Sequence, residues 1–127
     1  MPTTLPRVAL AAATAVSALA LTASFASAAP APPKVFGTVG PGFTINLMQK
    51  GKRVTHLKPG TYAFVIADKS KIHNFELERT KGPEFERELT DVSWVGTKTV
   101  LVKLTKGTYK YFCDPHASTM RGSFTVS

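Results

Sequence analysis

Cysteine and histidine are scarce in this 127-residue chain, which has one cysteine and three histidines. A single cysteine cannot form an intramolecular disulfide, so the sequence excludes a small domain stapled by disulfides. Three histidines are too few to build a second metal cluster beside a first, unless subunits assemble. Acidic residues number 8 against 16 basic ones, yet the basic residues form no nucleic-acid recognition motif, so nucleic acid is not an expected partner.

The first 28 residues have the pattern of an export signal. Arg7 is followed by an uncharged, Ala-rich run and by small residues that end in Ala26-Ser27-Ala28. The sequence therefore predicts a signal peptide at residues 1–28, cleaved after Ala28, and an exported protein that is periplasmic or extracellular. An uncleaved anchor is the alternative, but the second half of the run is rich in Ser, Thr and Ala and is weakly apolar.

This cleavage defines the predicted domain organisation. Residues 29–34 are a Pro-rich linker, and residues 35–127 form one domain, near the size at which a single hydrophobic core folds unaided. Because Arg7 is the only charged residue in the removed segment, the mature chain keeps a net charge of +7. In an oxidising compartment its lone cysteine is buried, paired with another chain, reactive or held by a metal ion.

Short segments of alternating apolar residues predict an all-β domain. The strands are expected at residues 43–47, 61–66, 73–77, 99–104, 108–112 and 121–126. The composition of residues 84–89 allows a short helix or a loop. Gly-Thr-Tyr occurs at 60–62 and again at 107–109, each time after a turn, which fits opposite halves of a Greek-key sandwich. The prediction is a Greek-key β-sandwich of about seven to eight strands.

One loop between the last two predicted strands contains three side chains that bind soft metal ions. These are Cys113, His116 and Met120, and His73 lies at the start of an earlier predicted strand. Thiolate and thioether are soft ligands and imidazole is intermediate, so this set suits copper, which cycles between two oxidation states. Taken singly, a cysteine or methionine at such positions is more often a core residue. Their spacing favours the metal site.

The same residues resemble the type 1 (blue) copper ligands of the cupredoxins. The Cys-to-His spacing matches plastocyanin and amicyanin, and the His-to-Met spacing matches azurin. The resemblance implies the cupredoxin topology and one type 1 copper ion. Its ligands would be Cys113 as thiolate, His73 and His116 as neutral imidazoles, and Met120 as a long axial ligand.

Two more residues are expected beside the ligands. Asn74 resembles the family's asparagine that ties the first ligand strand to the cysteine loop. Asp114 departs from the Ser or Thr that many members carry after the cysteine. A carboxylate there favours the more highly charged ion, so the hypothesis is a lowered reduction potential. His56 lies in a polar, basic stretch before a Pro-Gly turn and is left out of the predicted site.

The resemblance implies a small electron carrier that shuttles single electrons between transient protein partners. It is not an enzyme, has no small-molecule substrate and is expected to be a monomer. In the family the loop histidine, here His116, reaches the surface through an apolar patch. The alternative is an extracytoplasmic protein that binds or delivers copper. A multicopper enzyme is excluded because Phe112 and Asp114, rather than histidines, flank the cysteine.

The basic charge bears on the partners. Six basic residues crowd the first half of the domain and would speed the encounter with an acidic redox partner: Lys50, Lys52, Arg53, Lys58, Lys69 and Lys71. A solvated basic surface with no such role is the alternative.

Overall fold

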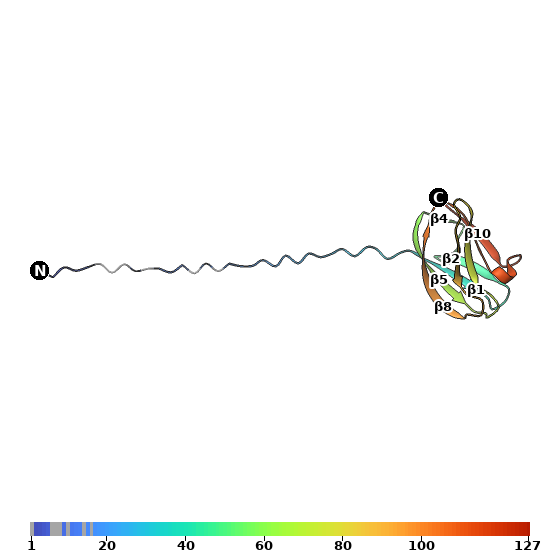
Figure 1. Ribbon diagram of the computed structural model, residues 1–127, viewed down its shortest axis with the longest axis horizontal. Helices are drawn as coiled ribbons and strands as arrows, with labels where there is room; N and C mark the ends of the chain where they lie inside the picture. The colour runs from blue at the N-terminus through green and yellow to red at the C-terminus, as the bar shows by residue number, and fades with distance from the viewer. Residues whose placement is uncertain (1, 6–8, 10, 14, 16) are drawn as a thin grey trace.

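The computed structural model describes residues 2–5, 9, 11–13, 15 and 17–127. The described residues before Lys34 carry no regular secondary structure (Figure 1). Seven residues of the predicted signal peptide, among them Arg7, lie outside the described residues. The signal peptide and its cleavage site therefore stay predictions. Within the described part of the chain, no helix has the length and hydropathy that a membrane span requires.

The domain is built from two five-stranded sheets, which confirms the predicted all-β sandwich (Figure 1). The first sheet has the order β3-β2-β1-β5-β8 and the second has the order β4-β10-β9-β6-β7. The strand bounds are β1 Lys34–Val39, β2 Ile45–Gln49, β3 Lys52–Arg53, β4 His56–Leu57, β5 Gly60–Asp68, β6 Phe75–Lys81, β7 Glu86–Thr90, β8 Gly96–Leu104, β9 Gly107–Phe112 and β10 Arg121–Val126. A short 3₁₀ turn, η1, spans Asp114–His116.

Two parallel pairings give the sandwich its topology. β1 pairs with β5 and β4 pairs with β10 in parallel, whereas the remaining neighbours are antiparallel. Parallel neighbours cannot be joined by a tight hairpin, so the chain crosses between the sheets before it returns.

Alternating residues of both sheets fill the space between them. In β5 the side chains of Tyr62, Phe64 and Ile66 are buried, as the period-two pattern requires. The second sheet contributes stacked aromatic rings, with centroid distances of 5.8 Å for Phe75–Tyr111 and 5.4 Å for Tyr109–Phe124. These stacked rings add to the hydrophobic core between the sheets.

The two ends of the sandwich are distinct. At one end, which we call the linker pole, β1 begins at Lys34 and the chain crosses between sheets from Leu57 to Gly60 and from Leu104 to Gly107. At the other end, the site pole, β9 ends at Phe112 and β10 begins at Arg121. In Figure 1 the N-terminal segment enters on the side of the domain opposite the short helical turn η1.

The repeated Gly-Thr-Tyr segments form matching corners at the linker pole. The hydroxyl of Tyr62 donates to the carbonyl of Lys58 at 2.8 Å, and that of Tyr109 donates to the carbonyl of Thr105 at 3.0 Å. Each hydroxyl thus reaches back four residues and closes the turn that feeds its strand. One corner opens β5 in the first sheet and the other opens β9 in the second.

Two expectations for the secondary structure are wrong, and one strand has no counterpart among the expected ones. Phe43 was placed inside a strand, but β2 begins at Ile45 and the Phe43 ring is 61% exposed. Residues 84–89 were given a helix or loop, but Glu86–Thr90 pairs with β6 as strand β7. β1 was not predicted as a strand, although Val35 and Val39 are fully buried in it. Pairing with a neighbouring strand outweighs local composition in the last two cases.

Candidate metal centre

The cysteine loop is clamped at both ends by β9 and β10. The N–H of Cys113, the residue after β9, donates to the carbonyl of Met120 at 3.0 Å. Between them, η1 turns the chain, and the N–H of His116 donates to the carbonyl of Cys113 at 3.1 Å. The N–H of Met120 in turn donates to the carbonyl of His116 at 2.8 Å. Backbone hydrogen bonds within the loop therefore hold Cys113, His116 and Met120 in a fixed conformation.

His73 reaches this loop from the other side of the site pole. It lies between β5 and β6, and its imidazole is fully buried. The backbone of Gly40, which follows β1, lies close to this ring, since a Cβ added to Gly40 would be 3.5 Å from its Cδ2. Residues 40 positions apart in the sequence thus meet at one point.

Three side-chain atoms converge there. The Nδ1 atoms of His73 and His116 are 3.0 Å apart, and each is 3.6 Å from the sulfur of Cys113. A point equidistant from the three atoms lies about 2.0 Å from each, close to the bond lengths that metals form with imidazole and thiolate. These three residues are the group in the described chain whose atoms could hold a metal ion.

Metal binding explains the arrangement of these three side chains better than hydrogen bonds among them do. Two neutral imidazoles that face each other through Nδ1 share at most one proton between those nitrogens, and a thiol is a weak donor. Met120 adds a soft thioether residue to the same loop, and its side chain is buried. A thiolate, two imidazoles and a nearby thioether match the donors that copper accepts in both of its oxidation states.

Asn74 links the two segments that supply the ligands. Its side chain is fully buried, and its Oδ1 accepts a hydrogen bond from the N–H of Asp114 at 2.7 Å. Asp114 meets Asn74 through its backbone, while its side chain is exposed. Residue 74 follows one histidine and residue 114 follows the cysteine, so this bond ties the two segments together.

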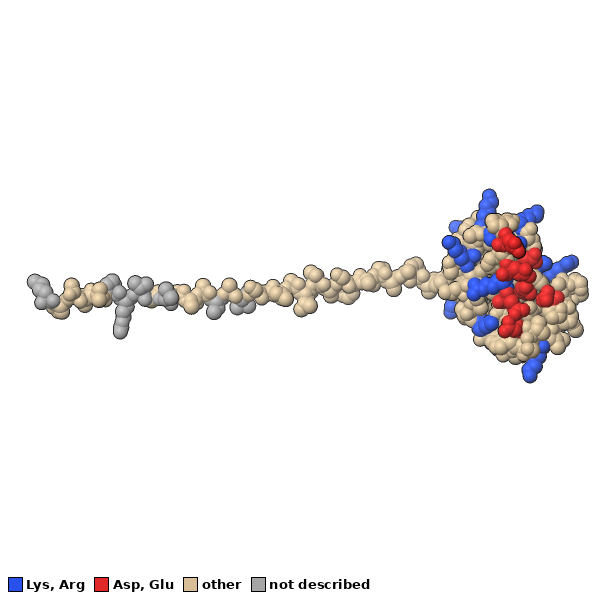
Figure 2. Space-filling model, viewed as in Figure 1, with Lys and Arg blue, Asp and Glu red and all other residues tan. Residues whose placement is uncertain are grey.

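Acidic residues surround the outer side of Asn74. Burial raises the pKa of Glu76 to about 7, helped by a hydrogen bond with Glu86. The pKa of Glu88 is also raised, mainly because its side chain hydrogen-bonds with Asp91. We call Glu76, Glu86, Glu88 and Asp91 the acidic cluster. Figure 2 shows acidic side chains gathered in one stripe of the visible face, with basic ones around it.

Phe43 is a site residue that the sequence reasoning missed. Its ring packs edge-on against both imidazoles, with centroid distances of 5.3 Å to His73 and 4.9 Å to His116. Its position directly after Pro41-Gly42 could have signalled a loop, but the alternating pattern of the following strand concealed it. Phe43 covers the site from the solvent side.

Exposure differs among the site residues. His73, Cys113 and Met120 are buried, whereas His116 is partly exposed. Among the uncharged residues that precede Phe43 or flank His116 in the chain, Pro41, Gly42 and Pro115 are exposed and Ala117 is half-buried. Ile72 and Phe43 add two exposed apolar side chains at this end.

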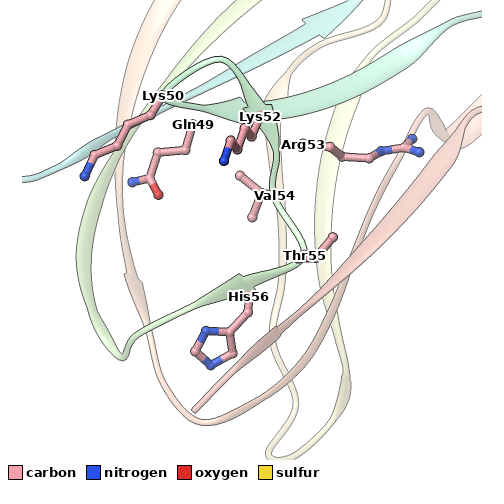
Figure 3. Close-up of a pocket in the computed structure, with 7 residues that line it drawn as sticks. All are labelled: Gln49, Lys50, Lys52, Arg53, Val54, Thr55 and His56. Carbon is pink, nitrogen blue, oxygen red and sulfur yellow. The ribbon is translucent and has the colours of Figure 1, made fainter.

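A surface pocket of about 450 Å³ lies at the linker pole, away from the converging ligand atoms. It is lined by Gln49, Lys50, Lys52, Arg53, Val54, Thr55 and His56 (Figure 3). Figure 3 shows the side chains of Lys50 and Arg53 pointing away from each other. The ring of His56 lies 2.8 Å from the hydroxyl of Ser127, so this third histidine is not part of the metal centre.

Comparison with known proteins agrees with this geometry. Residues 39–127 match the model of a family described as copper-binding proteins of the plastocyanin/azurin family. The solved structure of auracyanin A, a blue copper protein from the green thermophilic photosynthetic bacterium Chloroflexus aurantiacus, is similar with a TM-score of 0.55 and 17% identity. That alignment covers 76% of this chain and 100% of auracyanin A.

Reduced rusticyanin is similar with a TM-score of 0.51 and 22% identity, over 74% of this chain and 78% of the other. At these identities the two structures show a shared fold. No curated protein sequence matches this chain.

Proposed function

This chain belongs to the plastocyanin/azurin family of copper-binding proteins, and from that premise we propose that it is an exported carrier of single electrons. It binds one copper ion, as the family and the converging donor set show. The observation that supports electron transfer is the placement of those donors. Three of the four site residues are buried, two of them (Cys113 and Met120) at the ends of the clamped loop, and the fourth, His116, is partly exposed.

Each ligand has a role that its position supports. Cys113 would bind copper as a thiolate, His73 and His116 through Nδ1, and Met120 through its thioether sulfur. When bound, copper supplies a one-electron exchange between its two oxidation states. The cysteine must lose its proton and the imidazoles must be neutral, so copper affinity should fall in acid.

The surrounding chain keeps the ligand geometry nearly constant. The loop between Cys113 and Met120 is closed by its own backbone hydrogen bonds and by those of two strands. Ligands that rest on several packed elements move little when the charge of the site changes. A small structural change on electron transfer is what a carrier requires, whereas rapid delivery of copper requires ligands that open easily.

His116 is the residue through which electrons would enter and leave. Its imidazole packs against the ring of Phe43, and the uncharged residues Pro115 and Ala117 flank it in the chain. Such a surface suits a brief encounter with another redox protein, because it carries few charges that must lose water on docking. We propose transient protein partners, no small-molecule substrate and a monomeric carrier rather than an enzyme.

Only the basic residues near the metal centre would help to orient an acidic partner for electron transfer. Lys50, Lys52, Arg53 and Lys58 lie at the linker pole, whereas Lys69 and Lys71 precede His73 at the site pole. A partner attracted to the linker pole would meet the wrong end of the molecule. Replacing Lys69 and Lys71 by Gln should therefore weaken the salt dependence of electron transfer to an acidic partner, and the Lys50→Gln, Lys52→Gln variant is the control.

The decisive experiment uses the purified domain with Cu(II). A type 1 site should give an intense visible thiolate-to-copper band and reversible one-electron reduction. Cys113→Ser should abolish the band, and His116→Gln should weaken or shift it, whereas the matched His56→Gln variant should keep the wild-type spectrum. Colour that survives Cys113→Ser would end the assignment, and a site that binds copper but does not cycle would favour storage or delivery.

Two finer proposals have their own tests. If the protein is exported, the secreted or periplasmic form should begin at Ala29, which N-terminal sequencing would determine. A protein that starts at Met1 would contradict export.

The carboxylate of Asp114 lies one residue from the thiolate, so we propose that it lowers the reduction potential. Asp114→Ser should then raise the potential measured by spectroelectrochemistry, and an unchanged potential would refute the idea.

A further inference from the structure

The side-chain amide of Asn74 is held on three sides. Its Oδ1 accepts from the N–H of Asp114 at 2.7 Å, and its Nδ2 donates to Glu88 at 3.0 Å and to Glu76 at 3.4 Å. The amide is fully buried. Both N–H groups of the amide are therefore used by carboxylates, and its oxygen accepts one bond from the cysteine loop.

The carboxylates decide which way this amide points. Rotating it by half a turn would place its N–H groups against the N–H of Asp114 and its oxygen against two carboxylates. Both contacts would then be repulsive, and the buried amide of Asn74 would lose its hydrogen bonds, whereas the exposed carboxylate of Glu88 could still bind water. Glu88 and Glu76 thus select the orientation in which the oxygen faces Asp114.

Holding the N–H of Asp114 also fixes the peptide that leaves Cys113. This peptide begins η1, and η1 ends at His116, whose N–H donates back to the carbonyl of Cys113. A rotation of the peptide would change the direction of both the thiolate and the imidazole. Through its hydrogen bonds, Asn74 therefore connects the acidic cluster to the backbone of Cys113 and His116.

The packing of β6 and β7 explains why the acidic residues reach Asn74 together. Glu76 and Glu88 are cross-strand partners, and the register shifts between Phe75 and Glu76. The groups that face them are Glu86 and Asp91 from β7 and the loop after it, Asp114 from the cysteine loop, and Asn74 itself. Lys110 on the neighbouring β9 is paired with Glu78 instead, at 2.9 Å. Apart from burial, neighbouring acidic groups raise the pKa values of Glu76 and Glu88, and the hydrogen bonds from Asn74 lower them.

We propose that Glu88, assisted by Glu76, is a positioning residue for the metal centre: it orients the Asn74 amide, which in turn holds the peptide between Cys113 and Asp114. Glu88 acts through Asn74, because it supplies the hydrogen-bond acceptor for the Nδ2 group of Asn74. A carboxylate supplies that acceptor, and so does the amide oxygen of a glutamine. The part that concerns copper rests on the proposed function, whereas the part that concerns the peptide does not.

The first test measures hydrogen exchange of the Asp114 amide in the metal-free full chain. Glu88→Ala removes the acceptor and should raise the exchange rate of this amide by about tenfold or more, since local opening costs less. Glu88→Gln keeps an acceptor and should stay close to wild type. Glu84→Ala, in the loop that precedes β7, is the matched control and should change nothing.

Each other outcome would overturn the proposal. An unchanged rate in Glu88→Ala would show that the carboxylate does not hold the peptide. Equal rates in Glu88→Ala and Glu88→Gln would show that the charge acts rather than the acceptor. Faster exchange in Glu84→Ala would show that loss of any acidic side chain loosens the sheet.

The second test adds Cu(II) to the same variants. Glu88→Ala should bind copper about tenfold more weakly and shift the visible band, and Glu88→Gln should restore both. If exchange responds but copper affinity and the band do not, the contact serves only the fold and the proposal is wrong. Failure of the proposed function is distinguishable, because the wild-type protein would then show no thiolate-to-copper band.

Discussion

The linker pole and the site pole of the sandwich are held together by different means. At the linker pole, two tyrosine hydroxyls close short connections between the sheets, and basic residues lie outside them. At the site pole, longer loops carry buried histidine and cysteine side chains under a thin cover of exposed apolar residues. The comparison teaches that the features that stabilise this fold are largely separate from those that serve the metal, so each can be altered alone.

The largest expected effect is at Gly107, at the linker pole. A Cβ there would lie 2.3 Å from the carbonyl oxygen of Lys81, a backbone atom that cannot move aside. Gly107→Ala should lower the free energy of unfolding by about 3 kcal/mol, measured by urea denaturation of the copper-free domain. Gly42→Ala is the control at the site pole, where nothing lies within 4 Å of the new atom. Equal stability of the two variants would contradict the comparison.

A smaller loss is expected when one corner is opened. Tyr109→Phe leaves the ring in the core and removes the hydroxyl that donates to Thr105. The carbonyl of Thr105 then lacks this donor, so the free energy of unfolding should fall by about 1–2 kcal/mol. The copper spectrum should not change, because the hydroxyl lies at the opposite pole. A shifted visible band in Tyr109→Phe would show that the two poles are coupled.

A third effect depends on pH and belongs to the site pole. Burial raises the pKa of Glu76 from 4.5 to about 7, so the folded protein binds more protons than the unfolded chain between these values. The free energy of unfolding should therefore fall as the pH rises from about 4.5 to about 7. Because the side chain is partly solvated, the expected loss is only about 1 kcal/mol.

Glu76→Gln carries no charge at any pH and should remove this dependence. The variant should be more stable than wild type at pH 8 and similar to it at pH 5, measured by urea denaturation of the copper-free domain. Glu84→Gln, outside the acidic cluster, serves as the control. A wild-type pH profile in Glu76→Gln would show that other groups cause the loss.

The smallest effect on stability, but a clear effect on the metal, is expected at Phe43. Its ring is largely exposed, so Phe43→Ala should lower the free energy of unfolding by only about 0.5 kcal/mol. Because the ring packs on both imidazoles, copper should leave for a chelator about tenfold faster. Phe36→Ala, which removes a 48% exposed ring on β1, is the matched control and should release copper at the wild-type rate. Equal release rates would mean that Phe43 does not protect the site.

Much of this fold could be predicted because its strands carry a strong local pattern. The last strand was expected at residues 121–126 and occurs as Arg121–Val126. The repeated Gly-Thr-Tyr segments were expected in opposite halves of the sandwich, and they begin strands of different sheets. The ligand loop was predictable because its three donor residues lie within eight positions and their chemistry is unusual.

The remaining features depend on contacts between distant segments. β7 is an edge strand with polar residues on most positions, so only its pairing with β6 makes it a strand. Phe43 belongs to the site because the loop before β2 folds over two imidazoles, and no spacing rule in the sequence relates residue 43 to residue 116. The contact of Glu88 with Asn74 depends on the register of two strands, which a one-residue shift would abolish.

The point where β1 begins has a practical consequence. Lys34 starts the first strand at the end of the sandwich opposite His116, and the preceding segment leaves the domain there (Figure 1). A handle fused before Lys34 would therefore hold the protein on an electrode or a bead with His116 facing the solution. Immobilisation through a residue of the cysteine loop would turn His116 toward the support.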